Sequence, residues 1–110
     1  MNMNDLNFTE MQAMQKTLQE KYKEKWGGLP PEKAREKLLW MLAEAGEVAD
    51  VIKKNGDRNI LSDPAVRMRF VEEMCDVMMY FNDVLLCYGV TPDEFTQVYR
   101  EKHMHNMGRW

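Results

Sequence analysis

Four carboxylates have the residue type and the spacing to bind a cation together. Glu44 and Glu47 lie three residues apart, and Glu73 and Asp76 repeat that spacing further along the chain. Residues three apart on an α-helix point to the same side, one turn from each other. Each pair would therefore form a short acidic stripe along its helix.

An α-helix turns by about 100° per residue. Placed around the helix axis at this angle, each acidic pair lies beside an arc of apolar residues. The first arc contains Leu38, Met41, Ala45, Val48, Ala49 and Ile52. The second arc contains Phe70, Met74, Val77, Phe81, Val84, Leu85 and Tyr88. Antiparallel packing of the two helices through these arcs would turn the two acidic stripes toward each other.

Four carboxylates brought together need compensation. Like charges at this spacing destabilise a helix by roughly 0.2–0.5 kcal/mol per pair, and a closer group costs more unless a cation binds or the pKa values rise. Magnesium prefers carboxylate oxygens and is commonly shared with substrate phosphates. A di-iron site would want Glu-x-x-His pairs, but Arg100 and Lys102 stand three residues before His103 and His105. The residues therefore favour Mg²⁺, although such acidic pairs also occur on solvated helix faces.

Start and stop signals predict four helices. Thr9, Asp63 and Thr91 are expected N-caps, and glycines at 27, 28, 56 and 89 follow expected helix ends. The expected helices are 9–26, 30–54, 64–88 and 92–105, with 57–62 as a loop. The chain is therefore expected to be all-α and to form one domain over residues 1–110.

Composition excludes several functional classes. The chain has 110 residues, a net charge of −3 and 45% hydrophobic residues. The acidic balance argues against a nucleic-acid partner, and no apolar run approaches the ~20 residues of a membrane helix. Cys75 and Cys87 would lie roughly 18 Å apart on one helix, too far for a disulfide, and are expected to be reduced and buried. We expect a soluble cytoplasmic protein with no membrane contact.

The residues around the carboxylates resemble a known family. The string Leu-Ala-Glu-Ala-Gly-Glu at 42–47 and the Glu-Met-Cys-Asp at 73–76 are similar to the MazG-type nucleotide pyrophosphohydrolases of the all-α NTP pyrophosphatase superfamily. Their signature is Glu-x-x-Glu on one helix and Glu-x-x-Asp on the next. The resemblance extends from about residue 38 to the C-terminal end. Many members carry a further Glu where this chain has Ala43.

This resemblance implies a bundle of four to five helices with two long antiparallel helices, assembled as a homodimer or homotetramer. It implies hydrolysis of an NTP or dNTP at the α–β phosphate bond to a monophosphate and pyrophosphate, for nucleotide-pool housekeeping. Mg²⁺, or Mn²⁺ in its place, would be the cofactor. The metal ligands and catalytic residues would be Glu44, Glu47, Glu73 and Asp76. Because Glu47 lies mid-stripe, we expect it to take the proton of the attacking water.

Several further side chains are candidates for binding substrate. Lys54 lies on the stripe edge beyond Glu47 and could hold pyrophosphate. Trp40 lies one turn before Glu44 and could stack on a base, as could Trp26. Packing in the core or at a subunit contact is the alternative for either tryptophan.

The C-terminal end supplies a second group of candidates. Lys102, Asn106 and Arg109 resemble a basic ending that contacts phosphates in some family members. Cations near a helix C-terminus are also common without any ligand. Tyr80 and Asp83 extend the second acidic stripe. Asp83 could complete a metal shell, or Asn82 and Asp83 could contact a base or sugar.

Two other functional classes remain open at the level of sequence. A non-catalytic helical interaction module would use the apolar arcs and the 11 methionines to bind partner helices. A nucleotide-binding sensor would bind substrate without releasing product. Dependence on Mg²⁺ and product formation distinguish these classes from an enzyme.

Overall fold

The computed structural model describes residues 5–109, which are helical and contain no β-strand. The elements are α1 (Phe8–Lys21), α2 (Lys23–Trp26), the 3-10 helix η1 (Pro31–Lys33), α3 (Ala34–Asn55), α4 (Asp57–Ser62), α5 (Pro64–Cys87) and α6 (Pro92–Met107). The all-α class expected from the sequence is confirmed. Among the described helices, none is long and apolar enough to cross a membrane.

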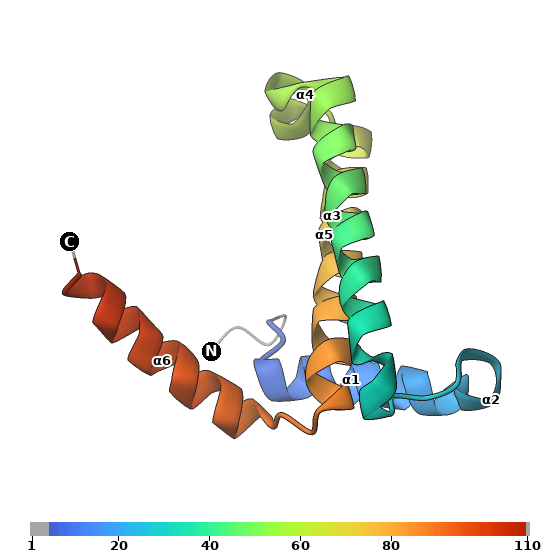
Figure 1. The fold of residues 1–110 in the computed structure, drawn as a ribbon. Helices are drawn as coiled ribbons and strands as arrows, with labels where there is room; N and C mark the ends of the chain where they lie inside the picture. Colours follow the sequence, from blue (N-terminus) through green and yellow to red (C-terminus); the bar gives the residue numbers. More distant parts are fainter. Residues whose placement is uncertain (1–4, 110) are drawn as a thin grey trace.

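The two longest helices, α3 and α5, lie side by side as an antiparallel hairpin (Figure 1). The short helix α4 joins them at one end, and α1 crosses the other end. Asp63 begins α5 as expected, since its carboxylate accepts hydrogen bonds from the amides of Ala65 and Val66 at 3.0 and 3.4 Å. This hairpin puts the two acidic stripes on neighbouring helices.

Three local expectations are wrong. The first helix begins one residue earlier, because Asn7 rather than Thr9 is its N-cap and accepts from the Glu10 amide at 2.8 Å. It also breaks at Tyr22, so that α2 is a separate turn. The expected loop at 57–62 is the helix α4, in which the Ser62 hydroxyl donates back to the Arg58 carbonyl at 2.7 Å.

The buried residues are more polar than the apolar arcs suggest. Among the described residues, the buried apolar ones are Ala34, Val48 and Cys87, and the buried polar ones are Gln12, Gln15, Gln19, Asn82 and Asp83. The expected burial of both cysteines is wrong for Cys75, which is exposed. Polar side chains thus fill much of the interface between α1 and α5.

The expected core arcs stay partly open to solvent within one chain. Leu38 is 41% exposed, Met74 47% and Tyr88 64%. The radius of gyration is 16.3 Å, against about 13 Å for a compact domain of this size. The helix α6 diverges from the α3–α5 hairpin instead of lying along it, although Phe95 near its start stacks on Phe8 with ring centres 5.0 Å apart (Figure 1). A single chain therefore leaves much apolar surface uncovered.

Replacing Asp63 with Ala should lower the free energy of unfolding by about 1 kcal/mol, because two amides at the start of α5 lose their acceptor. Urea denaturation followed by circular dichroism measures this change. Ser62→Ala is the matched control, because the Ser62 side chain caps no amide in α5, and its effect should stay within about 0.5 kcal/mol. Equal effects of the two substitutions would contradict the assigned cap.

Candidate metal site and adjoining pocket

Three of the four predicted carboxylates converge between α3 and α5. One carboxylate oxygen each from Glu44, Glu47 and Glu73 lies within 4.8 Å of the other two. Glu44 and Glu47 are one turn apart on α3, and Glu73 comes from the neighbouring helix α5. The sequence spacing supplies one pair, and the antiparallel packing of the hairpin supplies the third carboxylate.

Two oxygens of this cluster are buried without a partner. Glu44 and Glu73 are half-buried, and the Oε2 atom of each has no hydrogen-bond partner among the described residues. Glu47 is exposed to solvent. Buried acceptors normally have a hydrogen-bond donor or a cation beside them. The cluster therefore offers both unsatisfied oxygens and access from solvent.

The electrostatics of the cluster disfavour three bare negative charges. Burial, followed by the charge of Glu47 and a hydrogen bond with its carboxyl group, raises the pKa of Glu44 from 4.5 to about 7. The charge of Asp76 and a hydrogen bond with Glu73 act in the same direction. A carboxyl group with such neighbours either keeps its proton near neutral pH or gives it up to a bound cation.

Asp76, the fourth predicted ligand, lies at the edge of the cluster. It is not among the carboxylates within 4.8 Å of one another, and its side chain is exposed. Its charge nevertheless acts on Glu44, and its side chain lines a neighbouring pocket. The donor set is composed of carboxylate oxygens, which fits a hard divalent cation such as Mg²⁺ and not a metal that prefers nitrogen or sulfur.

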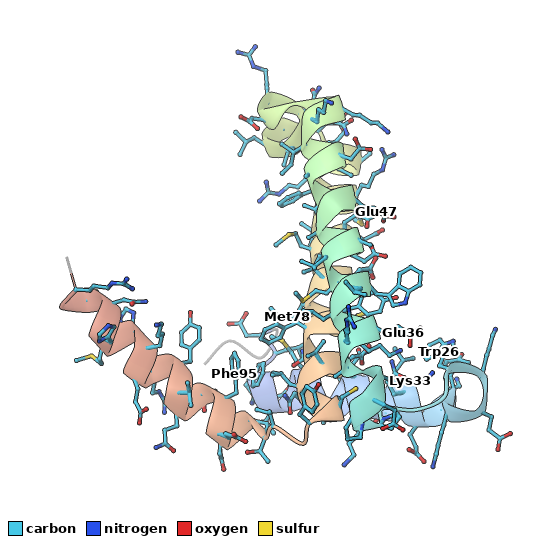
Figure 2. All side chains as sticks on the ribbon, viewed as in Figure 1. Trp26, Lys33, Glu36, Glu47, Met78 and Phe95 are labelled. Carbon is cyan, nitrogen blue, oxygen red and sulfur yellow. The ribbon has the colours of Figure 1, made fainter. Side chains whose placement is uncertain are left out.

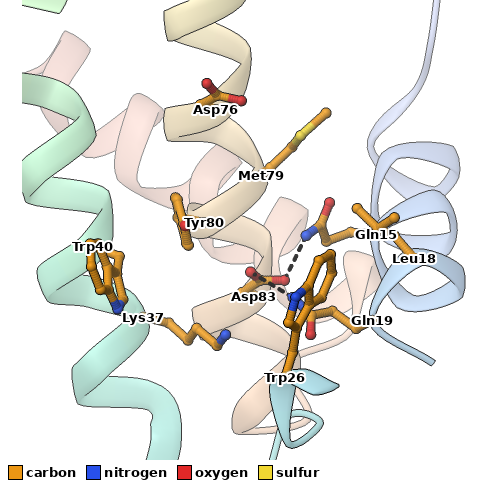
Figure 3. Close-up of a pocket in the computed structure, with 10 residues that line it drawn as sticks. All are labelled: Gln15, Leu18, Gln19, Trp26, Lys37, Trp40, Asp76, Met79, Tyr80 and Asp83. Carbon is orange, nitrogen blue, oxygen red and sulfur yellow. Dashed lines mark hydrogen bonds between the residues drawn. The ribbon is translucent and has the colours of Figure 1, made fainter. Parts of the chain in front are cut away.

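A pocket of about 370 Å³ adjoins the acidic cluster, between α1, α2, α3 and α5 (Figure 3). Its aromatic lining is Trp26, Trp40 and Tyr80. Its polar lining is Gln15, Gln19, Lys37, Asp76 and Asp83. Burial, followed by the charges of Glu44 and Asp83, raises the pKa of Tyr80. The Tyr80 hydroxyl therefore keeps its proton and can donate a hydrogen bond.

Asp83 is held by two glutamines that the sequence analysis did not single out. The side-chain amides of Gln15 and Gln19 donate to its two carboxylate oxygens at 2.8 and 3.1 Å. Burial raises the pKa of Asp83, while Gln15, Lys37 and Gln19 oppose that shift. The spacing of Gln12, Gln15 and Gln19 puts them on one helix face, and this was the available signal in the sequence. No neighbouring residue indicates that Gln15 and Gln19 bind Asp83.

The structure separates the predicted substrate residues into two groups. Trp40 and Trp26 both line the pocket. Lys54 does not line it and forms an ion pair with Asp50, at 2.9 Å, on the exposed side of α3. Lys37, near the start of the same helix α3, lines the pocket instead.

The C-terminal candidates lie away from the cluster within one chain. Lys102 and Asn106 are in α6, and Arg109 follows it. Figure 2 shows Glu47 well up the hairpin, whereas α6 leaves the base of the hairpin near Phe95 and extends away from it. These three side chains could therefore reach an acidic cluster only in another copy of the chain.

Comparison of this chain with protein-family models, with curated proteins and with solved structures found no match in any of the three. The resemblance noted in the sequence therefore stays a hypothesis. A functional assignment can be argued from the geometry of the carboxylates and of the pocket without the family resemblance.

Stability should depend on pH through Glu44. Its pKa of about 7 in the folded protein lies above the ordinary 4.5, so the folded state holds this proton more tightly than the unfolded state. The free energy of unfolding should therefore fall as pH rises from about 4.5 to about 7 and stay low above that range. Thermal melting across this range, with and without Mg²⁺, measures the effect.

Added Mg²⁺ should raise Tm more at about pH 8 than at about pH 5, because cations compete with the proton for the same oxygens. Glu44→Gln should flatten both dependences, while Glu36→Gln, on an exposed turn of the same helix, should change neither. A Mg²⁺ effect of equal size at both pH values would contradict this site.

Proposed function

We propose that the protein hydrolyses nucleoside triphosphates at the α–β phosphate bond in a Mg²⁺-dependent reaction, releasing a monophosphate and pyrophosphate. The observation that carries this proposal is the junction of a carboxylate cluster with a pocket walled by aromatic side chains. Phosphoryl chemistry needs charge neutralisation on phosphate oxygens and an aligned water. The sequence resemblance to MazG-type pyrophosphohydrolases supports the same reaction.

Each carboxylate has a role that follows from its position. Glu44 and Glu73, with their unpartnered buried oxygens, would be the inner ligands of Mg²⁺, and Asp76 would complete the set from the side of the pocket. When bound, Mg²⁺ supplies charge neutralisation and lowers the pKa of a coordinated water. Glu47 is exposed beside these ligands and would accept a proton from the attacking water.

The pocket would bind the nucleoside end of the substrate. Trp26 and Trp40 offer flat apolar surfaces on which a base can stack. Lys37 is a cation within the same lining and could contact a phosphate oxygen. This assignment replaces Lys54 as the preferred phosphate contact, because Lys54 is already paired with Asp50.

Assembly with further copies of the chain is part of the proposal. Leu39, Leu42, Met78 and Met79 are each about half exposed on the α3–α5 hairpin. Exposed apolar surface on this scale is typical of a subunit contact. A homodimer or homotetramer would complete the expected bundle of four to five helices, and it could bring Lys102, Asn106 and Arg109 of one copy to the acidic cluster of another.

The first test is a hydrolysis assay with every canonical NTP and dNTP, in Mg²⁺ or in EDTA, with products separated by ion exchange. We expect monophosphate and pyrophosphate in Mg²⁺ alone. Glu73→Gln should reduce kcat/KM at least about 100-fold, because it removes an inner carboxylate ligand. Diphosphate and phosphate as products would contradict cleavage of the α–β bond, but they would not contradict the metal site.

Glu72→Gln is the matched control for this experiment. Glu72 is the adjacent acid on α5, it is exposed, and it lies outside the cluster. Its substitution makes the same change in net charge and should leave activity unchanged. Absence of product from every nucleotide would favour the non-catalytic interaction module, which the exposed apolar faces of the hairpin also support.

Light scattering coupled to size-exclusion chromatography should give a mass of two or four chains. Leu42→Glu should shift the mass toward one chain, because it puts a charge on the exposed apolar surface of α3. Arg35→Glu, on an exposed position near the start of the same helix, is the control for the added carboxylate. A single-chain mass for the unaltered protein would exclude assembly.

A further inference from the structure

We propose that α2 is a lid over the pocket, and that Lys33 positions this lid so that the Trp26 ring covers the base of a bound nucleotide. The inference rests on the proposed nucleotide function and adds the element that controls access to the same site. The contacts of α2 carry it, because one side chain from beyond Gly28 holds this short helix in place.

The helix α2 has few contacts with the rest of the protein. Among the described helices, its backbone packs against α1 alone, although Trp26 at its end lines the pocket together with residues of α3 and α5. Trp26 is 37% exposed, and its ring contact with Tyr22, at 4.6 Å between centres, lies within the same short segment. Elements with few packed contacts open at a low cost in free energy. The Trp26 wall of the pocket can therefore move more easily than the walls on α3 and α5.

The backbone at each end of α2 can act as a hinge. The helical run breaks at Tyr22, whose φ of −108° and ψ of 22° lie outside the α-helical range. At the other end, Gly27 and Gly28 both have positive φ, at 84° and 72°. Hinges are short stretches at the ends of elements that absorb changes in φ and ψ. Rotation about these two points would move α2 as one unit and carry Trp26 with it.

Lys33 links α2 to the chain that follows the two glycines. Its ammonium group donates to the Trp26 carbonyl oxygen at 3.3 Å, and Figure 2 labels the two residues close together. Among the hydrogen bonds of the described residues, this one alone joins α2 to any residue beyond Gly28. Trp26 is the last residue of α2, where unpaired carbonyl oxygens and the helix dipole favour a cation. Because Lys33 directly precedes α3, the hydrogen bond fixes Trp26 relative to the helix that carries Trp40.

Gly27 leaves the space that the lysine end occupies. A Cβ atom at position 27 would lie 2.7 Å from the Lys33 ammonium nitrogen, which is too close for both to stay in place. The lysine side chain is flexible, so an alanine here would push the ammonium group off the Trp26 carbonyl. Gly28 also has positive φ, but a Cβ atom there would meet only Cγ of Lys23, at an ordinary 3.7 Å. The two glycines therefore form a matched pair that separates loss of the hydrogen bond from backbone strain.

Fluorine NMR of the full chain labelled with fluorotryptophan tests the lid without any nucleotide. The chain has three tryptophans, and the Trp26 resonance is the one that Trp26→Phe removes. The difference in its chemical shift between ordinary and heavy water reports the exposure of its fluorine to solvent. We expect Lys33→Met and Gly27→Ala to increase this difference toward that of free fluorotryptophan, because both remove the hydrogen bond to α2.

Three further variants are controls for the same measurement. Lys33→Arg keeps a cationic donor, Gly28→Ala adds similar backbone strain, and Lys25→Met makes the same charge change on α2 itself. Each should leave the exposure of Trp26 close to that of the unaltered protein. An unchanged Trp26 signal in Lys33→Met would overturn the inference, as would equal effects of Gly27→Ala and Gly28→Ala. Circular dichroism identifies any variant that fails to fold.

Turnover in Mg²⁺ tests what the lid does for a nucleotide. For the triphosphate that the unaltered protein hydrolyses best, Lys33→Met should raise KM about threefold or more, because it removes one hydrogen bond of modest net strength. The change in kcat should be smaller, since Lys33 neither belongs to the acidic cluster nor lines the pocket. Lys33→Arg should restore KM, and Lys25→Met should leave it unchanged. A KM unaffected by Lys33→Met would overturn the inference and leave the proposed hydrolysis intact.

Failure of the proposed function gives a different pattern of results. If the unaltered protein hydrolyses no triphosphate, the proposed reaction is wrong, and the Trp26 fluorine signal still decides whether Lys33 holds α2 over the pocket. Increased exposure of Trp26 in Lys33→Met, with Lys33→Arg unchanged, would then support the lid. The same exposure in both variants and in the unaltered protein would contradict it.

Discussion

The packing of α3 against α5 is the constraint on which the site depends. It forces carboxylates from two helices into one small volume, where their mutual repulsion and partial burial raise the free energy of the ionised state. A protein could avoid this cost by replacing any one of the three glutamates. The three glutamates therefore cost stability unless something compensates their charge, and an all-oxygen donor set fits a hard cation in that role.

The same hairpin connects the acidic cluster to the pocket. Asp76 and Tyr80 follow Glu73 along one side of α5, and Asp83 is the next residue on this line to reach the pocket. A single helix thus carries ligand candidates at one end and the polar network with Gln15 and Gln19 at the other. The rigidity of the helix would fix the distance between the two ends of a bound substrate.

The interior of this chain is unusual because polar groups take much of the place of an apolar core. The α1 helix packs on α5 through glutamines, and large apolar side chains of both long helices remain exposed. Burying polar groups contributes specificity of packing rather than much net stability. The proposed assembly with other copies would cover these exposed faces, and α6 diverges from the hairpin instead of covering them within one chain.

The sequence by itself determined the all-α class, the two long helices in their order and the two acidic pairs, because caps and i, i+3 spacing act over a few residues. Asp63 and Thr91 are caps in the structure as predicted. Local rules failed where two signals compete, as at Asn7 and Thr9, and where the short connection between α3 and α5 is itself the helix α4. The periodicity of apolar residues indicated which helix faces are apolar. It does not determine whether other residues of this chain or a second chain cover those faces.

Only the tertiary structure decided which distant residues meet. Glu73, and not Asp76, lies in the cluster with the two glutamates of α3. Lys37 lines the pocket, whereas Lys54 is paired with Asp50. The tertiary structure also joined Gln15 and Gln19 to Asp83 across separations of 68 and 64 residues. These outcomes depend on how α1 crosses the hairpin and on the rotation of each helix about its axis. Both are set by packing between elements, which no local pattern of residues specifies.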